Sequence, residues 1–440
     1  MTGPETGVRL RSMDQHIYQV LLRLNPWITD SGKWPECTEK YIPESFVPRL
    51  QTPSLRADRV TLLIGPRQSG KSTLIWRLIN QQTDPYLYLN CEEPSLRELA
   101  ASPALFLDAV EKIAPDADGF FLDEVQHLDE AGLFLKGLAD LRIHKPIVAT
   151  GSSSFHLRAK TRESLAGRAE RHLILPFSFE EVRPEHRAPA VQAVKNGRIW
   201  EELLLWGGYP EVYLSREKQP VLNRLVEAFI LRDASDLYRI KNPRAFRRLL
   251  GLAASQIGDL ANFSNLAEVL GISVNTVAQY LSILEESHII QLVKPYVGGK
   301  RAEITSRPKI YFMDNGLRNA LFGGFTPIED RSDMGKLMEN LVFTELCKYT
   351  NPLLDTIHFW RSSSQAEVDF VLVREGRLMA VEVKASRMKK PKVSRSLRSF
   401  IDAYKPQRVL VVNNALREKF MINDTPIHFI LGTELKSQLI

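Results

Sequence analysis

Residues 65–72 have the types and spacing needed to hold a phosphate group: they read Gly-Pro-Arg-Gln-Ser-Gly-Lys-Ser. This fits the pattern GxxxxGK[ST], whose glycines let successive backbone N–H groups surround an anion. Lys71 supplies a cation for the β- and γ-phosphate oxygens of ATP, and Ser72 offers a hydroxyl to Mg²⁺. We therefore expect nucleotide contacts from Gly65, Pro66, Arg67, Gln68, Ser69, Gly70, Lys71, Ser72 and Thr73.

Two carboxylates further along the chain have the chemistry to complete this site. The apolar run 119–122 predicts a buried parallel strand that ends in Asp123 and Glu124. Asp123 is expected to hold Mg²⁺, and Glu124 to polarise the water that attacks the γ-phosphate. An Asp-Glu pair that closes a strand is also common as a solvated turn or a helix cap, and that alternative applies to the pair taken alone.

Two further polar groups follow the next strand, 146–150. Ser152 is expected to sense the γ-phosphate, with Ser153 as its alternative and an ordinary serine-rich turn as the simpler explanation. Arg168 is a candidate arginine finger, which in a ring would reach the nucleotide of a neighbouring subunit. An arginine that only forms a salt bridge is the competing interpretation.

A second chemical constellation lies near the C-terminus. Alternation along the strand 381–384 places Glu382 and Lys384 on one face, and an adjacent strand brings Asp369 beside them. These groups could form a metal-dependent phosphodiesterase site in which Asp369 and Glu382 hold Mg²⁺ and Lys384 orients water, with Glu339 as an additional ligand. A Glu-x-Lys sequence on a strand is more often a surface salt bridge.

The elements that must position these residues indicate an α/β protein of several domains. Strands alternate with helices in a way that predicts a parallel sheet. We divide the chain into an N-terminal extension (1–55), a P-loop α/β core (56–185), a helical connecting region (186–262), a winged helix (263–325) and a C-terminal α/β domain (326–440).

The predicted winged helix begins with a helix, a Gly-containing turn and a second helix capped by Ser273. Val277, Leu281 and Leu284 are expected to face its core. Base reading by Asn275, Thr276 and Gln279 is one use of such a helix, and plain packing is the other.

Composition and charge limit the classes of protein that remain. The 440 residues are 44% hydrophobic and 25% charged, without an apolar run long enough for a membrane span, so we expect a cytoplasmic protein that does not bind membranes. The three cysteines lack metal or disulfide spacing. The net charge is only +6, but Lys384, Arg387, Lys389, Lys390, Lys392, Arg395 and Arg398 form an acid-free run, which favours either phosphate contacts or a solvated helix face.

The chain resembles prokaryotic AAA-superfamily ATPases that carry a C-terminal domain of unknown function with a PD-(D/E)xK nuclease-like core. The resemblance covers about residues 55–435 and rests on Gly65–Ser72, Phe120–Glu124, Thr150-Gly151-Ser152, Ala166-Gly167-Arg168, Gly207-Gly208-Tyr209-Pro210, Arg232-Asp233, Glu339-Asn340, Glu367-Val368-Asp369 and Glu382-Val383-Lys384. It implies an ATPase that forms a homo-oligomer, with a hexameric ring as one form, and that acts on DNA by structure rather than by sequence. The resemblance also implies that the P-loop α/β core (56–185) is an ATPase core of AAA type and that the C-terminal α/β domain (326–440) is restriction-endonuclease-like.

Three functional hypotheses follow. The first is a Mg²⁺-dependent ATPase that couples hydrolysis to DNA remodelling, translocation or processing, as a branch-migration or helicase-like motor or as an ATP-regulated nuclease. The second is a nucleotide-controlled regulatory switch whose C-terminal domain binds DNA or protein without cleaving it. A metabolic P-loop kinase is disfavoured, because it would leave the helix-turn-helix and the second acidic site without a use.

Overall fold

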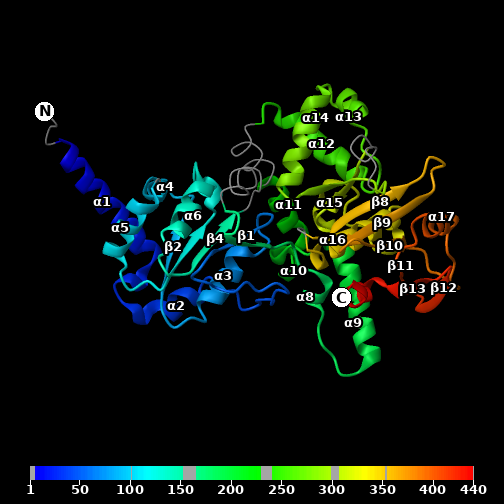
Figure 1. The fold of residues 1–440 in the computed structure, drawn as a ribbon, viewed down its shortest axis with the longest axis horizontal. Coiled ribbons are helices and arrows are strands. Elements are labelled where there is room, and N and C mark those ends of the chain that lie inside the picture. Colours follow the sequence, from blue (N-terminus) through cyan, green and yellow to red (C-terminus); the bar gives the residue numbers. More distant parts are fainter. Residues whose placement is uncertain are drawn as a thin grey trace. The chain divides into compact units, whose positions relative to one another are not determined.

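The computed structural model describes residues 5–100, 102–151, 165–228, 240–298, 307–351 and 354–439, and it gives side chains from residue 15 onward. The chain divides into two compact units, residues 1–174 and 175–440 (Figure 1). The Arg232-Asp233 motif lies outside the described residues, as do Ser152, Ser153 and residues 299–306.

The first unit is built on a parallel sheet of five strands in the order β2-β3-β4-β1-β5. The strands are β1 (Val60–Ile64), β2 (Tyr86–Asn90), β3 (Gly119–Asp123), β4 (Ile147–Gly151) and β5 (Ala169–Leu173). The first four are short, largely buried apolar runs, as expected for strands covered on both faces. The predicted α/β class is therefore confirmed, and β5 begins three residues before the strand expected at 172–175.

Helices cover this sheet and connect its strands (Figure 1). They are α3 (Lys71–Ile79), α4 (Pro94–Leu99), α5 (Pro103–Ile113) and α6 (Ala131–Asp140), with the 3-10 turn η3 (Val125–His127) directly after β3. Phe106 of α5 packs edge-to-face on both Phe120 of β3 and Phe134 of α6. Trp76 of α3 contacts Phe121, whose side chain follows Phe120 on the strand. Phe120 and Phe121, which are consecutive on β3, thus lie in two different hydrophobic clusters. This packing fixes the orientation of β3 and, with it, the position of the carboxylates at its end.

The N-terminal segment packs against the edge strand β2. It comprises α1 (Glu5–Leu24), η1 (Pro26–Ile28), η2 (Ser31–Lys33) and α2 (Trp34–Glu39). The Asn25 side-chain amide donates to the Tyr88 carbonyl at 2.9 Å and accepts from the Tyr88 N–H at 2.7 Å, and the Trp27 indole N–H donates to the Tyr86 carbonyl at 2.9 Å. These bonds satisfy backbone groups that an edge strand would otherwise expose.

The second unit begins with helices. They are α8 (Phe179–Val182), α9 (Pro189–Trp206), α10 (Pro210–Leu214), α11 (Lys218–Ala228) and α12 (Pro243–Ser255). Residues 175–185, which the sequence assigned to the ATPase core, pack within this unit: the Phe179 N–H donates to the Glu345 carboxylate, and Lys348 donates to the Phe177 carbonyl at 2.7 Å. The unit boundary at 174 depends on these contacts with a helix far away in sequence.

The Gly207-Gly208 pair has a structural role in this unit. Gly207 has φ +74°, and a Cβ there would lie 2.1 Å from a carboxylate oxygen of Asp314. A Cβ on Gly208 would lie 2.3 Å from the Phe177 carbonyl oxygen. The Asp314 carboxylate accepts from the Gly208 N–H at 2.7 Å and caps helix α15 (Asn315–Leu321). The glycines are therefore required by close packing, and they contribute no chemistry of their own.

The middle of the second unit contains α13 (Phe263–Leu270), α14 (Val274–Glu286) and an antiparallel pair, β6 (Ile290–Val293) and β7 (Lys309–Phe312). Ser273 accepts from the Thr276 N–H and caps α14, while Val277, Leu281 and Leu284 are buried, so these local predictions are confirmed. Asn275 and Gln279 are exposed. Among the described residues no single helix has the length and apolar character to cross a membrane, and only α13 and α14 taken together, bent by 104°, meet those two criteria.

The C-terminal part is a mixed sheet of six strands in the order β12-β13-β11-β10-β9-β8. Its elements are η6 (Ile328–Asp330), α16 (Met334–Tyr349), β8 (Thr356–Arg361), β9 (Glu367–Arg374), β10 (Arg377–Lys384), α17 (Arg395–Tyr404), β11 (Arg408–Asn413), β12 (Glu418–Ile422), β13 (Thr425–Leu431), η7 (Gly432–Glu434) and α18 (Leu435–Leu439). Strands β9 and β10 form an antiparallel hairpin, and β10, β11 and β13 are parallel neighbours. The predicted juxtaposition of Asp369 with Glu382 and Lys384 depends on this hairpin.

Candidate functional site

The phosphate-binding loop runs from the end of β1 to the start of α3, as its pattern predicts. Gly70 takes φ +89° immediately before the helix. Gly65 takes φ +151°, and a Cβ there would lie 2.1 Å from the Ile174 carbonyl oxygen. These two glycines are needed for backbone conformation and for close approach, respectively. The loop thus ends at the N-terminus of α3, where the first N–H groups of a helix favour an anion.

Lys71 is 4% exposed, and its ammonium lies across the loop. It donates to the Pro66 carbonyl at 2.8 Å and to the Gly65 carbonyl at 3.2 Å. Carbonyl oxygens thus serve here as the acceptors that phosphate oxygens would provide in a nucleotide complex. The lysine is positioned for the predicted role.

Ser72 of α3 and Asp123 at the end of β3 are hydrogen-bonded to each other, although they are distant in sequence. The Ser72 hydroxyl donates to Asp123 Oδ1 at 2.8 Å, and the Thr150 hydroxyl donates to the same oxygen. Burial raises the pKa of Asp123, and the hydrogen bonds from Thr150 and Ser72 only partly offset this. A hydroxyl and a carboxylate are hard oxygen donors, and protein sites for Mg²⁺ often supply only one or two such ligands beside phosphates. The pair therefore fits Mg²⁺.

Glu124 stands at a sharp turn of the backbone. Its φ is +57°, in the left-handed region that a residue with a side chain seldom adopts. Its N–H donates to Thr150 Oγ1 at 3.0 Å, and its carboxylate contacts the amide of Gln126. Such a conformation is retained only where the surrounding structure enforces it, and it occurs preferentially at functional sites. The backbone therefore changes direction between the two consecutive acidic residues, Asp123 and Glu124.

Three residues at this site were not assigned a role from the sequence. Thr150, at the end of the neighbouring strand β4, bridges Asp123 and the Glu124 N–H. Tyr88 on β2 donates to Asp123 Oδ2 at 3.3 Å. Arg49 of the N-terminal extension donates to the Ser69 carbonyl at 2.8 Å. The sheet order places β2 and β4 on either side of β3, and this order brings Tyr88 and Thr150 to Asp123. Thr150 belongs to the Thr150-Gly151-Ser152 motif of the family resemblance, but that motif alone gave it no role.

Replacing Thr150 by valine tests this bridging role. The change keeps the side-chain shape and removes the hydroxyl, so we expect ATP turnover to fall roughly 10- to 100-fold, the usual cost of losing a partner that orients a metal ligand. Thr61→Val is the matched control, because Thr61 is equally buried on β1 and its hydroxyl bonds only the Ser54 carbonyl, at 3.2 Å. Equal losses in the two variants, measured by phosphate release, would contradict the assignment.

Arg168 lies at the start of β5, next to Ala169, which pairs with Val60 at the start of β1. The phosphate-binding loop follows the other end of β1. Arg168 therefore lies at the opposite end of the strands from the phosphate-binding loop of its own chain. It is 42% exposed and forms an ion pair with Asp140. The predicted sensor Ser152 lies outside the described residues.

The predicted C-terminal residues do come together at one end of the β9–β10 hairpin. Asp369 accepts from the Val383 N–H at 2.7 Å. Glu382 is bound by Lys384 at 2.6 Å and by the Ser394 hydroxyl at 3.0 Å. Glu339 on α16 accepts from the Tyr311 hydroxyl. Burial and the nearby charge of Glu339 raise the pKa of Asp369 to about 8.

The sequence did not predict a buried lysine that enters this acidic cleft. Lys309, on β7, is 3% exposed, and its ammonium lies 2.6 Å from Glu367 and 3.3 Å from Glu339. Burial alone would lower the pKa of Lys309, but Glu339, Glu367 and Asp369 together outweigh it and raise the pKa. In the described part of the chain no three His, Cys, Asp or Glu side chains form a group that could hold a metal ion. The carboxylates at and around the magnesium site expected at Asp369 and Glu382 thus already have ammonium partners in Lys309 and Lys384.

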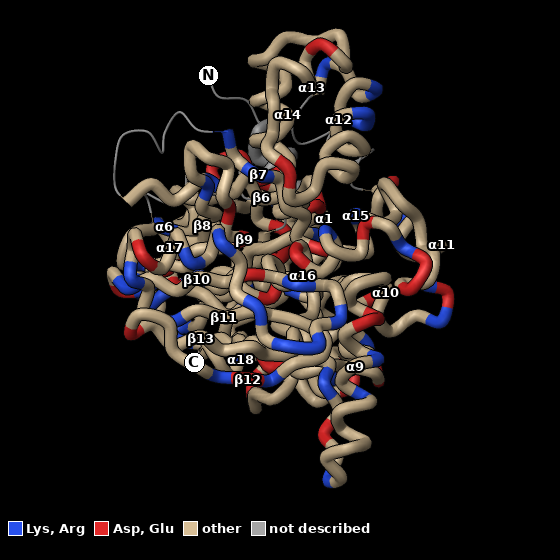
Figure 2. The backbone as a smooth tube through the Cα atoms, turned by 90° about the vertical axis from the view of Figure 1, so that its right-hand side faces the viewer, with Lys and Arg blue, Asp and Glu red and all other residues tan. Residues whose placement is uncertain are grey.

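Basic side chains are exposed beside this cleft and on α12. The acid-free run contributes the exposed residues Arg387, Lys389, Lys390, Lys392, Arg395 and Arg398, called the basic cluster below. Helix α12 exposes Arg244, Arg247 and Arg248, and its Lys and Arg positions are visible in Figure 2. Both surfaces have the charge that a polyanion requires.

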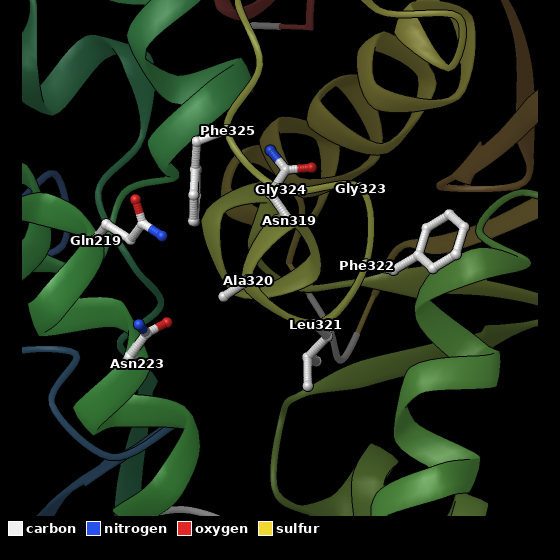
Figure 3. A pocket seen from close by; sticks show the side chains of 9 residues that line it. All are labelled: Gln219, Asn223, Asn319, Ala320, Leu321, Phe322, Gly323, Gly324 and Phe325. Carbon is white, nitrogen blue, oxygen red and sulfur yellow. The ribbon is translucent and has the colours of Figure 1, made fainter.

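A hollow of about 410 Å³ lies elsewhere in the second unit, between α11 and the loop that follows α15 (Figure 3). It is lined by Gln219, Asn223 and residues 319–325, none of which carries a charge. Amide and backbone groups can bind a ligand, but they supply no acid, base or nucleophile for catalysis. The hollow is not a candidate active site.

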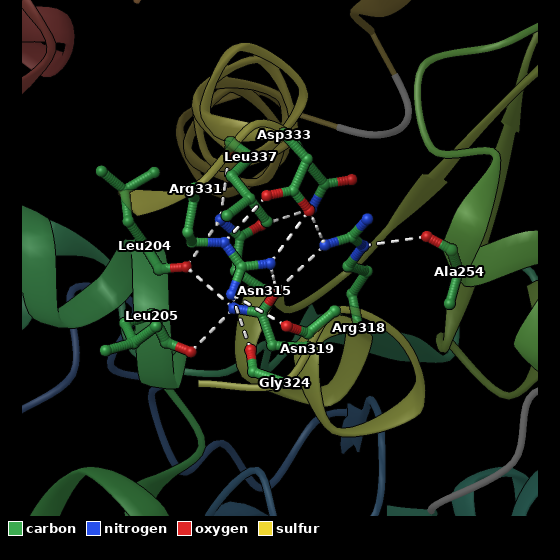
Figure 4. Close-up of polar contacts among 12 residues, drawn as sticks. Leu204, Leu205, Ala254, Asn315, Arg318, Asn319, Gly324, Arg331, Asp333 and Leu337 are labelled. Atoms are coloured by element: carbon green, nitrogen blue, oxygen red, sulfur yellow. Dashed lines mark hydrogen bonds and ion pairs between the residues drawn. The ribbon is translucent and has the colours of Figure 1, made fainter. Parts of the chain in front are cut away.

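A buried ionic network supports that loop from below (Figure 4). Arg331 donates to both oxygens of Asp333, at 2.8 and 2.9 Å, and to the Gly324 carbonyl at 2.6 Å. Arg318 binds the same carboxylate and donates to the Ala254 carbonyl at 2.8 Å. Burial alone would raise the pKa of Asp333, but the hydrogen bonds from Arg331 and Arg318 lower it. This network connects α12, α15 and α16 and is structural.

Three family models match successive parts of the chain. Residues 57–183 match the family model described as an AAA domain, and residues 197–328 and 334–430 each match a domain of unknown function, DUF8612 and DUF4143 respectively. An uncharacterized protein of Mycobacterium tuberculosis is 28% identical over 84% of this chain and 79% of its own length.

Solved structures with some likeness are much more distant. The replication initiator DnaA bound to AMPPCP and single-stranded DNA is 14% identical, over 56% of this chain and 92% of that one, with a TM-score of 0.26. A signal transduction ATPase of Pyrococcus horikoshii with a tetratricopeptide repeat sensor is 11% identical with a TM-score of 0.26, and this chain spans 47% of its length. Likenesses this loose carry no argument about function. The family match and the loop geometry agree: residues 57–183 match an AAA domain and contain the phosphate-binding loop, in one chain with two regions that match domains of unknown function.

Proposed function

We propose that this protein is a Mg²⁺-dependent ATPase. The observation that carries the proposal is the hydrogen bond of 2.8 Å between Ser72 of the phosphate-binding loop and Asp123 at the end of β3. Two motifs that are separate in sequence thereby present a hydroxyl and a carboxylate at one point. Ser72 and Asp123 would hold Mg²⁺ there, and the ion would supply positive charge against the negative charge that develops on the phosphates during hydrolysis.

Each residue of the site has a distinct part in the proposed reaction. The backbone N–H groups of the loop, which Pro66 lacks, hold the phosphates, and Lys71 turns from the Pro66 and Gly65 carbonyls to the phosphate oxygens. Glu124 accepts a proton from the attacking water, since its half-buried carboxylate follows directly after Asp123. Thr150 keeps both acidic residues in place through its single hydroxyl.

We further infer that hydrolysis is coupled to DNA through the second unit. The support is the basic cluster, six exposed cationic residues in a segment without acids, together with the arginines of α12. Phosphate contacts of this kind give affinity without sequence preference, which agrees with recognition of DNA structure. The alternative is a regulatory switch that binds DNA or a protein without coupled turnover.

Turnover measurements separate these functions. We expect the full-length protein to release phosphate from ATP with Mg²⁺, to lose this activity in EDTA, and to be stimulated by single-stranded, duplex or branched DNA. Slow hydrolysis that no DNA stimulates would favour the switch. A protein that neither binds nor hydrolyses ATP with Mg²⁺ present would overturn the proposal as a whole.

Charge reversal in the basic cluster tests the DNA contact directly. The Lys389→Glu/Lys390→Glu variant should bind DNA more weakly and reduce the slope of log affinity against log salt by about 2, because two phosphate contacts are lost. The matched control is Lys195→Glu/Arg198→Glu, which reverses two exposed charges on α9. Equal effects of both variants in a fluorescence-anisotropy titration would mean that only net charge matters.

A further inference from the structure

The acidic cleft at the end of the β9–β10 hairpin contains its own cation. The Lys309 ammonium is in contact with Glu367 at 2.6 Å and with Glu339 at 3.3 Å, and its side chain is 3% exposed. It also lies over the ring of Phe359, 5.4 Å from the centroid. Burying an ammonium group costs free energy unless charged partners surround it. These contacts therefore define a binding position for one positive charge.

The remaining acids of the cleft are bonded to other protein donors. The Val383 N–H binds Asp369, while Lys384 and the Ser394 hydroxyl bind Glu382. Tyr311, two residues after Lys309 on the same strand, binds Glu339. A divalent ion in this cleft would therefore have to break several of these bonds and meet the Lys309 charge at short range.

The position of Lys309 is fixed by backbone pairing as well as by charge. Strand β7 pairs with β6, and the Ala261 N–H donates to the Pro308 carbonyl at 2.7 Å. Next to β6, the Tyr296 N–H donates to the Phe359 carbonyl at 2.6 Å, which joins this region to β8. Lys309 lies on a strand of the preceding helix-turn-helix region, and these backbone hydrogen bonds hold it next to the sheet of the nuclease-like domain.

We propose that Lys309 is a built-in cation that replaces a metal ion in the nuclease-like cleft, so that this domain binds its partner without metal-dependent cleavage. The proposal concerns the second unit alone and is independent of ATP hydrolysis. It implies that Glu339, Glu367 and Asp369, which form no metal-binding group with Lys309 between them, will draw together around a divalent cation once the ammonium is removed, since they are oxygen-donor side chains of the kind that Mg²⁺ and Mn²⁺ accept.

Replacing Lys309 by methionine tests the proposal, because the change keeps the apolar stem and removes the charge. We expect the full-length wild-type protein, without nucleotide, to show no Mn²⁺ binding that depends on Asp369. Lys309→Met should bind one additional Mn²⁺ per chain by electron paramagnetic resonance titration, and the Lys309→Met/Asp369→Asn double variant should lose it. Lys336→Met is the matched control, since Lys336 pairs with Asp259 near the surface, on the same helix as Glu339.

Two results would overturn the proposal. One is wild-type Mn²⁺ binding that disappears in Asp369→Asn, which would mean that the cleft accepts metal with Lys309 in place. The other is a folded Lys309→Met protein without the added site. If Lys309→Met is folded but destabilised, Mn²⁺ should raise its Tm but not that of the wild type. The comparison of wild type with Asp369→Asn still tests whether the cleft accepts metal with Lys309 in place.

Discussion

Replacement of Glu124 by glutamine is expected to leave ATP binding intact and to reduce hydrolysis by about 10²- to 10⁴-fold, the range that a positioned general base contributes. The change preserves size and removes only the group that accepts a proton. Binding should persist because the proposed phosphate contacts come from residues 65–73 and the proposed metal ligands are Ser72 and Asp123, which are hydrogen-bonded to each other. Calorimetric titration with ATP and single-turnover phosphate release measure the two quantities separately.

The matched control for this variant is Glu98→Gln, an equivalent change at an exposed position on α4. Normal turnover in Glu124→Gln would remove Glu124 from the catalytic role. A mixture with Arg168→Ala chains extends the test to the proposed oligomer. In a ring, an intact Glu124 of one chain can meet an intact Arg168 of its neighbour, so two inactive variants should recover part of the activity when mixed; no recovery would contradict a role of Arg168 in a neighbouring site.

Replacement of Asp333 by asparagine should lower the free energy of unfolding of the second unit by about 3–5 kcal/mol, the usual cost of breaking a buried ion pair. The side chains of Arg318 and Arg331 are only 1% and 2% exposed, and both rely on this carboxylate. Its loss would leave two cations buried close together. Denaturant unfolding followed by tryptophan fluorescence reports on this unit through Trp200, Trp206 and Trp360 once Trp27, Trp34 and Trp76 of the first unit are replaced by Phe.

Asp259→Asn provides the control. The side chains of Asp259 and Lys336, which form an ion pair, are 51% and 39% exposed, so this pair should contribute no more than about 1 kcal/mol to the free energy of unfolding. The pH dependence gives a second criterion. The pKa of Asp333 is lowered in the folded protein, so its contribution is complete above the unfolded value of about 4 and is lost as the pH falls through the lower folded value. The Asp333→Asn protein should lack this component of acid destabilisation.

The ATP site could be predicted because its determinants are local. The glycines, Lys71 and Ser72 act within one loop whose conformation is set by neighbouring residues, and an apolar strand that ends in Asp123 has a single direction in a parallel sheet. The same reasoning found the cap at Ser273 and the hairpin that brings Asp369 near Glu382. Each of these inferences depends on residues close in sequence or on a fixed periodicity.

The tertiary structure decided which groups from distant segments complete or occupy the sites. Thr150 bonds the acids after β3 because β4 is its neighbour in the sheet, and Arg49 reaches the phosphate-binding loop from the N-terminal extension. Lys309 enters an acidic cleft formed by residues of α16 and β9. Strand order and the packing of one region on another are set by the burial of whole apolar surfaces. A short sequence motif contains no information about that burial. The sequence by itself therefore determined the chemistry available for ATP, and only the folded chain showed that the second acidic cleft holds a lysine.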